Sequence, residues 1–304
     1  MRALNALFKL NVINIFIIFL IIQQPVFAAA PNSETIDFLQ IKKHASLANA
    51  TYQSNPKIPD IAQLANYKIT HHEKINEFEV SFFVATNDID KSHIIAVRGT
   101  SNIENVFIDV AFKLIKDNNT GAYLHNGFSQ TANSIYKKIR PYIEPGYKIS
   151  TTGHSMGGAV ALIIAMRLDI DQHYIKQVVT FGQPKVTNIT GALNFKHLNL
   201  LRIVTPGDLV PLVPPFDPLD LNDLDIYWHM GEEIILKEGK DYSTIDGIES
   251  MLRATKFTQE ALSERNIIHH NMSLYLNMIN KKIPEANRVP YKNDYNIFNW
   301  FNAN

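Results

Sequence analysis

Residues 148–160 read KISTTGHSMGGAV, in which a β-prone run leads into Gly-x-Ser-x-Gly and small, helix-forming residues follow. This order is typical of a nucleophile elbow, a tight strand-to-helix turn with a serine at its apex. The serine of such a turn has a strained backbone, so the residues two before and two after it must be small. Gly153 and Gly157 meet that requirement around Ser155. The turn also places the serine hydroxyl at a helix N-terminus, where free N–H groups favour a developing negative charge.

The composition limits the kinds of fold, partner and chemistry that the chain can have. The 304 residues include 29 Lys+Arg and 29 Asp+Glu, and 46% of them are hydrophobic, which suffices for one large α/β domain with a substantial core. The near-neutral charge gives no reason to expect nucleic acid as a partner. The sequence has no cysteine, which excludes disulfides, thiol catalysis and cysteine-ligated metals.

Residues 1–28 have the layout of a secretory signal peptide. Arg2 and Lys9 supply positive charge, residues 12–22 are apolar, and Val26-Phe27-Ala28 places small residues at the offsets that signal cleavage requires. The apolar run is short for a membrane span. We therefore predict cleavage near Ala28 and an extracellular or periplasmic location, with an uncleaved N-terminal anchor as the alternative.

Strand and helix patterns alternate along the rest of the chain. Apolar or alternating runs predict strands at 77–84, 93–98, 148–154, 177–182 and 198–204, and helical spacing predicts helices at 33–52, 125–143 and 156–168. Residues 226–236 read as an antiparallel hairpin, and the chain from there to Lys282 reads as helical. We expect an α/β fold with a mostly parallel central sheet and helices on both faces. In such sheets, binding and catalytic residues usually lie at the carboxyl ends of the strands.

The serine needs a base beside it and a carboxylate that orients the base, because a serine hydroxyl is a poor nucleophile at neutral pH. In α/β-hydrolases the acid follows the serine in the chain and the histidine comes last. Asp208 is the best candidate for the acid, because it follows a buried strand at a Pro-Gly turn. Asp217 and Asp220 are alternatives, but they lie in the loop beyond it.

For the base, His269 and His270 compete, and His229 is a more distant candidate. Adjacent histidines point in different directions, so only one of the pair can reach Ser155, and their positions alone do not decide between them. His154 is expected to pack inside the elbow. His71-His72-Glu73 has no further ligand at metal-binding spacing, so no metal site is expected there.

Acyl transfer also requires backbone donors for the oxyanion. One should be the N–H of Met156, after the nucleophile, and the other comes from the loop after an earlier strand, where the Thr100 N–H fits. Loss of one such donor typically costs about 3–4 kcal/mol of transition-state stabilisation.

Six pieces of the chain resemble, in the same order, the class 3 lipases, the fungal-lipase-like branch of the α/β-hydrolases. They are VRGT at 97–100, HNGF at 125–128, GHSMGGA at 153–159, TFGQPKV at 180–186, DLVP at 208–211 and HNMSLY at 270–275. The resemblance implies a triad of Ser155, Asp208 and His270 with an oxyanion donor at Thr100. It favours His270 over His269 because the histidine of the family is often followed by a tyrosine, here Tyr275.

The resemblance also places a lid at residues 103–114. Ile103, Val106, Phe107 and Val110 recur there at helical spacing, and such a helix would cover the serine in water and turn its apolar face outward at a lipid surface. The alternative is that this helix simply packs on the core. Residues 29–285 would form the catalytic domain, and 286–304 an aromatic-rich tail that matches nothing in the family.

These inferences lead to one expected function and several rivals. The chain is expected to be a secreted serine carboxylic-ester hydrolase that needs no metal or cofactor and acts on lipid esters, with transient contact to a lipid interface. By resemblance triacylglycerol is the default substrate, and phospholipase A1 or feruloyl esterase activity is the alternative. An acyltransferase with the same triad is a further rival, and a non-catalytic lipid-binding or host-interaction protein is the rival from another class.

Overall fold

The computed structural model describes residues 36–100, 113–214, 226–254 and 268–291. The chain divides into two units, Met1–Asp37 and Phe38–Asn304, and every helix and strand given below belongs to the second. The predicted signal peptide, 1–28, lies outside the described residues. Within the described ranges, no helix has the length and apolar character needed to cross a membrane.

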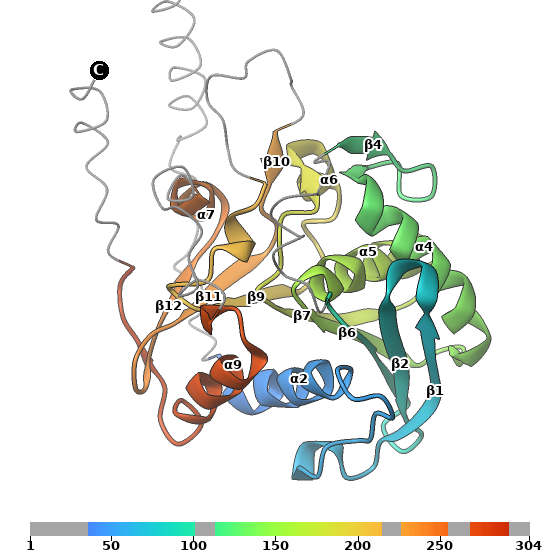
Figure 1. Cartoon of the computed structure of the whole chain (residues 1–304), viewed down its shortest axis with the longest axis horizontal. Coiled ribbons are helices and arrows are strands. Elements are labelled where there is room, and N and C mark those ends of the chain that lie inside the picture. The colour runs from blue at the N-terminus through green and yellow to red at the C-terminus, as the bar shows by residue number, and fades with distance from the viewer. Residues whose placement is uncertain (1–35, 101–112, 215–225, 255–267, 292–304) are drawn as a thin grey trace, which may run out of the picture. The chain divides into compact units, whose positions relative to one another are not determined.

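A nine-stranded sheet runs through the second unit in the order β1-β2-β3-β6-β7-β9-β11-β12-β13 (Figure 1). Five of its neighbouring pairs are parallel and three are antiparallel, so the predicted mostly parallel sheet is confirmed. The strands are β1 (Lys68–Ile75), β2 (Val80–Asn87), β3 (Ser92–Val97), β6 (Lys148–His154), β7 (Ile175–Phe181), β9 (Leu200–Val204), β11 (Glu232–Leu236), β12 (Asp241–Ile245) and β13 (Asn287–Arg288).

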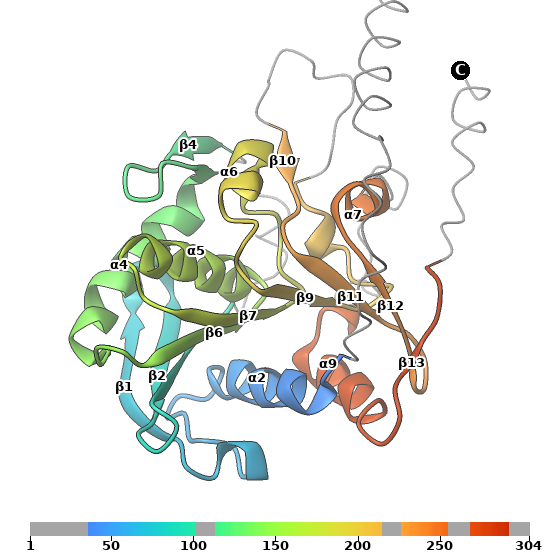
Figure 2. The same cartoon turned by 180° about the vertical axis from the view of Figure 1, so that it is seen from behind.

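Helices cover both faces of this sheet, as predicted. Helices α4 (Asn126–Ile139) and α5 (Met156–Ile170) lie on one face, while α2 (Phe38–Ala50) and α9 (Met272–Asn280) lie side by side on the other (Figures 1 and 2). Helix α5 is apolar on all sides because it lies between the sheet and α4. Helix α7 (Gly247–Ala254) follows β12, and short 3-10 turns span Ala62–Leu64, Asn76–Phe78, Arg140–Tyr142 and Val210–Leu212.

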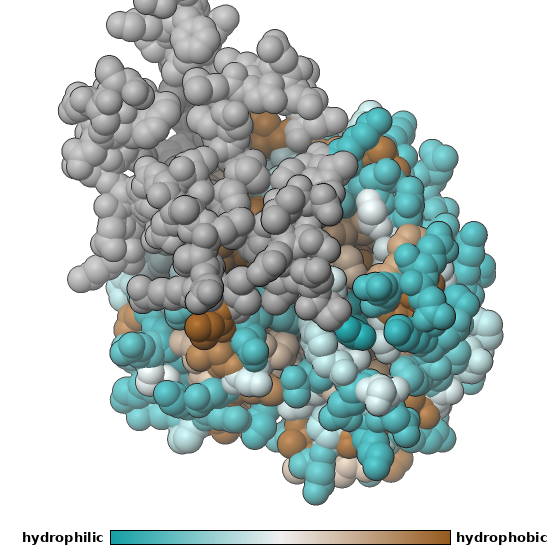
Figure 3. All heavy atoms as spheres, viewed as in Figure 1, coloured by the Kyte–Doolittle hydropathy of each residue, from teal (hydrophilic) through white to brown (hydrophobic). Residues whose placement is uncertain are grey.

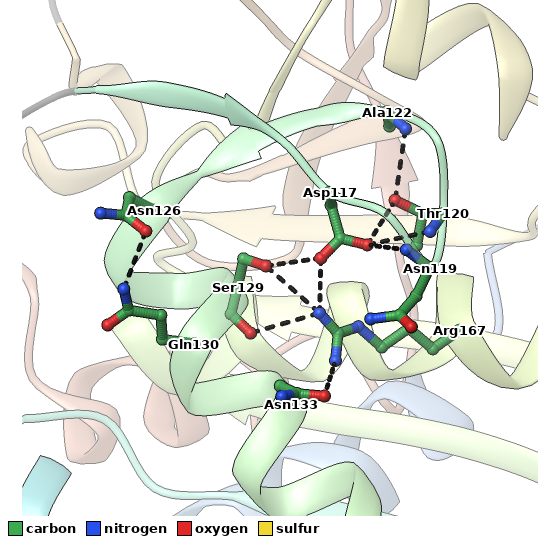
Figure 4. Close-up of polar contacts among 9 residues, drawn as sticks. All are labelled: Asp117, Asn119, Thr120, Ala122, Asn126, Ser129, Gln130, Asn133 and Arg167. Atoms are coloured by element: carbon green, nitrogen blue, oxygen red, sulfur yellow. Dashed lines mark hydrogen bonds and ion pairs between the residues drawn. The ribbon is translucent and has the colours of Figure 1, made fainter.

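A second, four-stranded sheet has the order β10-β8-β5-β4. It is formed by β10 (Tyr227–Trp228), β8 (Thr187–Asn188), β5 (Tyr123–His125) and β4 (Leu114–Lys116), and α6 (Ile189–Asn194) follows β8. The β4–β5 hairpin is held to α4 and α5 by a buried carboxylate, Asp117, which accepts hydrogen bonds from Ser129 Oγ at 2.7 Å and from Arg167 Nη2 at 2.6 Å (Figure 4). Its other oxygen accepts the Thr120 N–H at 2.9 Å, so one side chain joins three elements.

The predicted hairpin at 226–236 is wrong. Its first half, β10, pairs with β8 in the small sheet, whereas its second half, β11, joins the large sheet between β9 and β12. The antiparallel partner of β11 is β12, which lies in a stretch predicted to be helical. Alternating patterns identify strands, but they do not specify which strand each one pairs with.

One strand was missed, and two element boundaries differ from the prediction. Strand β1 was not predicted, because its sequence KITHHEKI is polar and its side chains are mostly half-buried. The surface over β1, β2 and α4 is accordingly mostly hydrophilic, with isolated apolar residues (Figure 3). Residues 76–78, partly assigned to the following strand, form a 3-10 turn that ends at Glu79 with φ 49°. Helix α2 begins at Phe38, after the non-helical Ile36 and Asp37.

The lid prediction lies largely outside the described residues, because 101–112 are not among them. Its last apolar position, Leu114, is not helical but begins β4. At the other end of the chain, β13 extends the large sheet, and Tyr291 packs against the apolar cluster of Val204, Ile235 and Ile245. The described start of the aromatic tail is therefore packed on the body.

Candidate active site

The turn between β6 and α5 has the geometry of the predicted elbow. Ser155 has φ 59° and ψ −134°, a region that L-residues rarely adopt. A Cβ on Gly153 would lie 2.4 Å from the backbone of Gly157, and one on Gly157 would lie 2.3 Å from Val97 O. Small residues at both positions are therefore required by direct backbone contact, and the strain at Ser155 is held by the strands on either side of β6.

Asp208 follows β9 and is fully buried. Its Oδ2 accepts hydrogen bonds from His270 Nδ1 at 2.7 Å and from the Tyr275 hydroxyl at 2.5 Å, and its Oδ1 accepts the Val210 N–H at 2.9 Å. The carboxylate is thus fixed by three donors. The two alternative acids, Asp217 and Asp220, lie outside the described residues.

Among the candidate bases, the structure brings His270 to Asp208. The neighbouring His269 points elsewhere, since its ring would lie 2.6 Å from a Cβ on Gly207 and its carbonyl accepts the Thr205 hydroxyl at 3.0 Å. His229 is buried near Arg202 and Lys185, and burial followed by these positive charges lowers its pKa well below the usual range. The Nδ1 contact to Asp208 leaves Nε2 of His270 as the basic nitrogen.

Ser155 is joined to this pair through Phe181 and Gly182. The Ser155 N–H donates to Phe181 O at 2.8 Å, and the next residue, Gly182, has φ +57° and meets both partners of the pair. A Cβ on Gly182 would lie 2.7 Å from Asp208 Oδ2 and 2.7 Å from His270 Cε1. The hydroxyl of Ser155 and Nε2 of His270 are both buried without a hydrogen bond to another described residue. They are therefore free to engage each other and a substrate.

The predicted oxyanion donors flank the serine. Thr100 and Met156 are both half-buried; Met156 is the first residue of α5, and Thr100 follows the end of β3. The chain before Thr100 runs along the elbow, because a Cβ on Gly99 would lie 3.0 Å from Ser155 Cβ and 2.5 Å from His154 O. The predicted lid residues Ile103, Val106, Phe107 and Val110 lie outside the described part of the chain.

Three residues at this site were not assigned a role from the sequence. Tyr275 was noted only for following the histidine, Gly182 only as part of a matching motif, and Tyr52, whose hydroxyl lies 2.7 Å from His154 Nδ1, was not noted at all. A tyrosine 102 positions before the elbow leaves no signal in a single sequence. No group of three or more His, Asp or Glu side chains in the described ranges is placed to hold a metal ion.

Comparisons with known proteins find lipases similar to this chain. The family model for lipase (class 3) matches residues 94–217. The lipase of Rhizomucor miehei is 28% identical over 164 residues, which cover 50% of this chain and 45% of that protein. The secreted mono- and diacylglycerol lipase 1 of Fusarium solani is 30% identical over 146 residues, covering 45% and 43%. The matched segment thus spans less than half the length of these relatives.

The fold extends the similarity further along the chain. The crystal structure of the Lip2 lipase of Yarrowia lipolytica superimposes with a TM-score of 0.54 at 28% identity, covering 66% of this chain and 79% of that one. The segment matched by the family model, 94–217, contains the elbow, Asp208 and strands β6, β7 and β9. In its α/β-hydrolase fold, its elbow and the segment 94–217, the chain is similar to the class 3 lipases.

Proposed function

We propose that the protein is a serine hydrolase of lipid carboxylic esters. The observation that carries the proposal is the buried His270–Asp208 pair next to a serine at a strained elbow, in a chain related to lipases. Ser155 is the nucleophile, His270 the general base and acid, and Asp208 the group that orients the imidazole. The catalytic domain extends over 29–285.

In the first half of the reaction, Ser155 Oγ attacks the ester carbonyl carbon and its proton passes to His270 Nε2. The carbonyl oxygen becomes an oxyanion, which accepts hydrogen bonds from the Thr100 and Met156 N–H groups. The bond to the alcohol oxygen then breaks, and this oxygen takes the proton from His270. An acyl group remains esterified to Ser155.

In the second half, water attacks the acyl-enzyme and gives a proton to His270. The new tetrahedral intermediate uses the same oxyanion donors and collapses, while His270 returns the proton to Ser155 Oγ. The carboxylic acid leaves, and the imidazole, held by Asp208 throughout, is ready for another turn.

Glycerolipid esters are the proposed substrates, and the protein is proposed to act after export. The similarity to the Fusarium solani protein named secreted mono- and diacylglycerol lipase 1 supports both points. The signal-peptide pattern of residues 1–28 supports export, and residues 103–114 are the proposed lid over the acyl-binding side.

Hydrolysis by wild type and by Ser155→Ala tests the proposal. Wild type should cleave p-nitrophenyl esters and emulsified acylglycerols, and the variant should lose roughly 10⁴-fold or more in kcat. An equally active variant would refute the role of Ser155. Faster release of phospholipid acyl chains would reassign the substrate to the phospholipase A1 class, and transfer to an added alcohol that outruns hydrolysis would indicate an acyltransferase. No turnover of any ester would favour a lipid-binding protein.

A further inference from the structure

Tyr52 and His154 form a pair beside the elbow that the reaction steps above do not use. Tyr52 lies two residues beyond the end of α2, and its hydroxyl is 2.7 Å from His154 Nδ1. His154 is the last residue of β6, directly before Ser155, and its ring is buried. The pair therefore joins a helix near the start of the folded body to the residue that precedes the nucleophile.

The direction of this hydrogen bond follows from the ionisation of its two partners. Burial and the nearby His270 lower the pKa of His154 well below its usual range, so its imidazole is neutral. Burial raises the pKa of the Tyr52 hydroxyl, which therefore keeps its proton. Between two neutral groups, the phenol O–H is the stronger donor and the unprotonated imidazole nitrogen the stronger acceptor, so the hydroxyl donates, Nδ1 of His154 accepts, and the imidazole proton lies on Nε2. Tyr52 thus selects one tautomer of His154.

The ring of His154 lies against the ring of His270. Their centroids are 4.3 Å apart with an interplanar angle of 33°. His270 is consequently held at Nδ1 by Asp208 and over its ring by His154. A neutral His154 adds no repulsion to the imidazolium that His270 becomes during the reaction, whereas a protonated one would.

Tyr52 is itself held in place by the chain that leads to Thr100. The Arg98 guanidinium carbon lies 5.5 Å from the centre of the Tyr52 ring, a cation–π distance. The Tyr52 hydroxyl would lie 2.8 Å from a Cβ on Gly99, so the backbone that leads to Thr100, the proposed oxyanion donor, passes directly by this hydroxyl. One tyrosine therefore contacts both the segment of Thr100 and the histidine that supports the base.

We propose that Tyr52 is a positioning residue: its hydroxyl fixes the orientation of His154, whose ring in turn keeps His270 directed at Ser155. This inference rests on the proposed hydrolase function. It predicts that the hydroxyl matters for the chemical step and not for substrate binding, because Tyr52 acts through His154 rather than on the ester.

The test compares Tyr52→Phe with Tyr67→Phe in the full chain. Tyr67 is a matched control, since its hydroxyl bonds Ser92 Oγ at 2.8 Å and its ring lies 5.7 Å from the Lys43 ammonium, outside the site. With p-nitrophenyl butyrate, Tyr52→Phe should lower kcat about tenfold while KM changes less than twofold. Tyr67→Phe should keep wild-type kcat.

The His154 tautomer gives a readout that does not depend on turnover. Long-range ¹H–¹⁵N spectra of the imidazoles, with the His154 signals identified by their loss in His154→Gln, should show the Nε2–H form in wild type and a mixture in Tyr52→Phe. An unchanged kcat, a change confined to KM, or an equal loss in Tyr67→Phe would overturn the proposal, and so would an unchanged tautomer. If wild type hydrolysed no ester, the hydrolase function would fail, and the tautomer spectra would still decide the role of Tyr52.

Discussion

The Tyr275 hydroxyl and His270 Nδ1 donate to the same oxygen of Asp208, at 2.5 and 2.7 Å. Tyr275 lies on the first turns of α9, five positions after the histidine, so the helix that follows the base also fixes the acid. Burial and the Asp208 charge raise the pKa of Tyr275 well above its usual range, and its hydroxyl remains a donor throughout the working pH range.

Replacing Tyr275 by Phe removes that donor and leaves the ring. We expect kcat for ester hydrolysis to fall about tenfold and the free energy of unfolding to fall by about 1.5–3 kcal/mol, the usual contribution of a hydrogen bond to a charged group. Steady-state kinetics and urea unfolding measure the two effects. Tyr242→Phe is the control, since Tyr242 is also buried but packs edge-on against Phe38. Wild-type kcat in Tyr275→Phe would contradict the positioning of Asp208 by Tyr275.

The two adjacent histidines should differ sharply on substitution. His270→Ala removes the only imidazole of the described residues that bonds Asp208, and we expect kcat to fall by roughly 10⁴-fold or more. His269→Ala should keep kcat within about fivefold, because its ring packs on Gly207, away from Asp208, and its backbone carbonyl, which the substitution retains, accepts the Thr205 hydroxyl. Turnover of p-nitrophenyl esters measures both. Loss of activity in His269→Ala alone would reverse the assignment of the base.

Gly182→Ala should damage the site through a single methyl group. The new Cβ would lie 2.7 Å from both Asp208 Oδ2 and His270 Cε1, so the pair must move apart. We expect kcat to fall at least 100-fold, since a displacement of about 1 Å has that effect on positioned groups.

Gly146→Ala is the control that separates the effect of this close contact from the effect of placing a side chain at a positive φ. Gly146 has φ +78°, and a Cβ there would meet no atom within 4 Å. It should lose about 1–2 kcal/mol of stability from the left-handed backbone and keep wild-type kcat. Equal kcat in the two variants would show that the close approach at Gly182 is not needed for activity.

Asp117→Asn should destabilise the fold in a pH-dependent way. Burial favours the protonated acid, but hydrogen bonds from Ser129 and Thr120 and the Arg167 charge outweigh it, so the pKa of Asp117 is lowered in the folded state. A carboxylate with a lowered folded pKa stabilises the protein above its unfolded pKa of about 3.9, and this contribution is lost as the pH falls through the folded value.

At pH 7, urea unfolding should therefore show Asp117→Asn to be about 3–5 kcal/mol less stable than wild type, the usual cost of breaking a buried ion pair. The difference should shrink as the pH is lowered below about 4. Asp169→Asn is the control, because Asp169 pairs with the exposed His197 and should matter by less than about 1 kcal/mol. A difference that stayed constant down to pH 2 would contradict the role of the Asp117 charge.

The parts of the fold that could be predicted are those whose structure is determined by residues close together in the sequence. Gly153 and Gly157 are required by contacts within the turn itself, so the motif reveals the elbow. The core strands β3, β7 and β9 carry apolar runs because the sheet is covered on both faces, and β6, whose residues are mostly polar, is recognised by the motif that follows it. Strand β1, half-buried and polar, lacks that pattern.

The parts that could not be predicted depend on contacts between distant segments. The partner of β11 is set by the sheet and not by its own residues, which is why the hairpin prediction failed. In the same way, the sequence alone could not decide which of the adjacent His269 and His270 is the base. Their tertiary contacts decide it, because His269 packs on Gly207 whereas His270 bonds Asp208. Tyr52 contacts His154 across more than a hundred residues, without any periodic pattern.

The packing of α2 against α9 has a consequence for when activity can appear. Helix α2 precedes the other described helices and strands in the chain and leaves the ribosome before them, whereas α9, with the base immediately before it, follows all of them except β13. Contacts of such large sequence separation close late in folding. A nascent chain that has already displayed its serine therefore has no base to activate it, and hydrolytic activity should begin only after α9 has been synthesised and packed on α2.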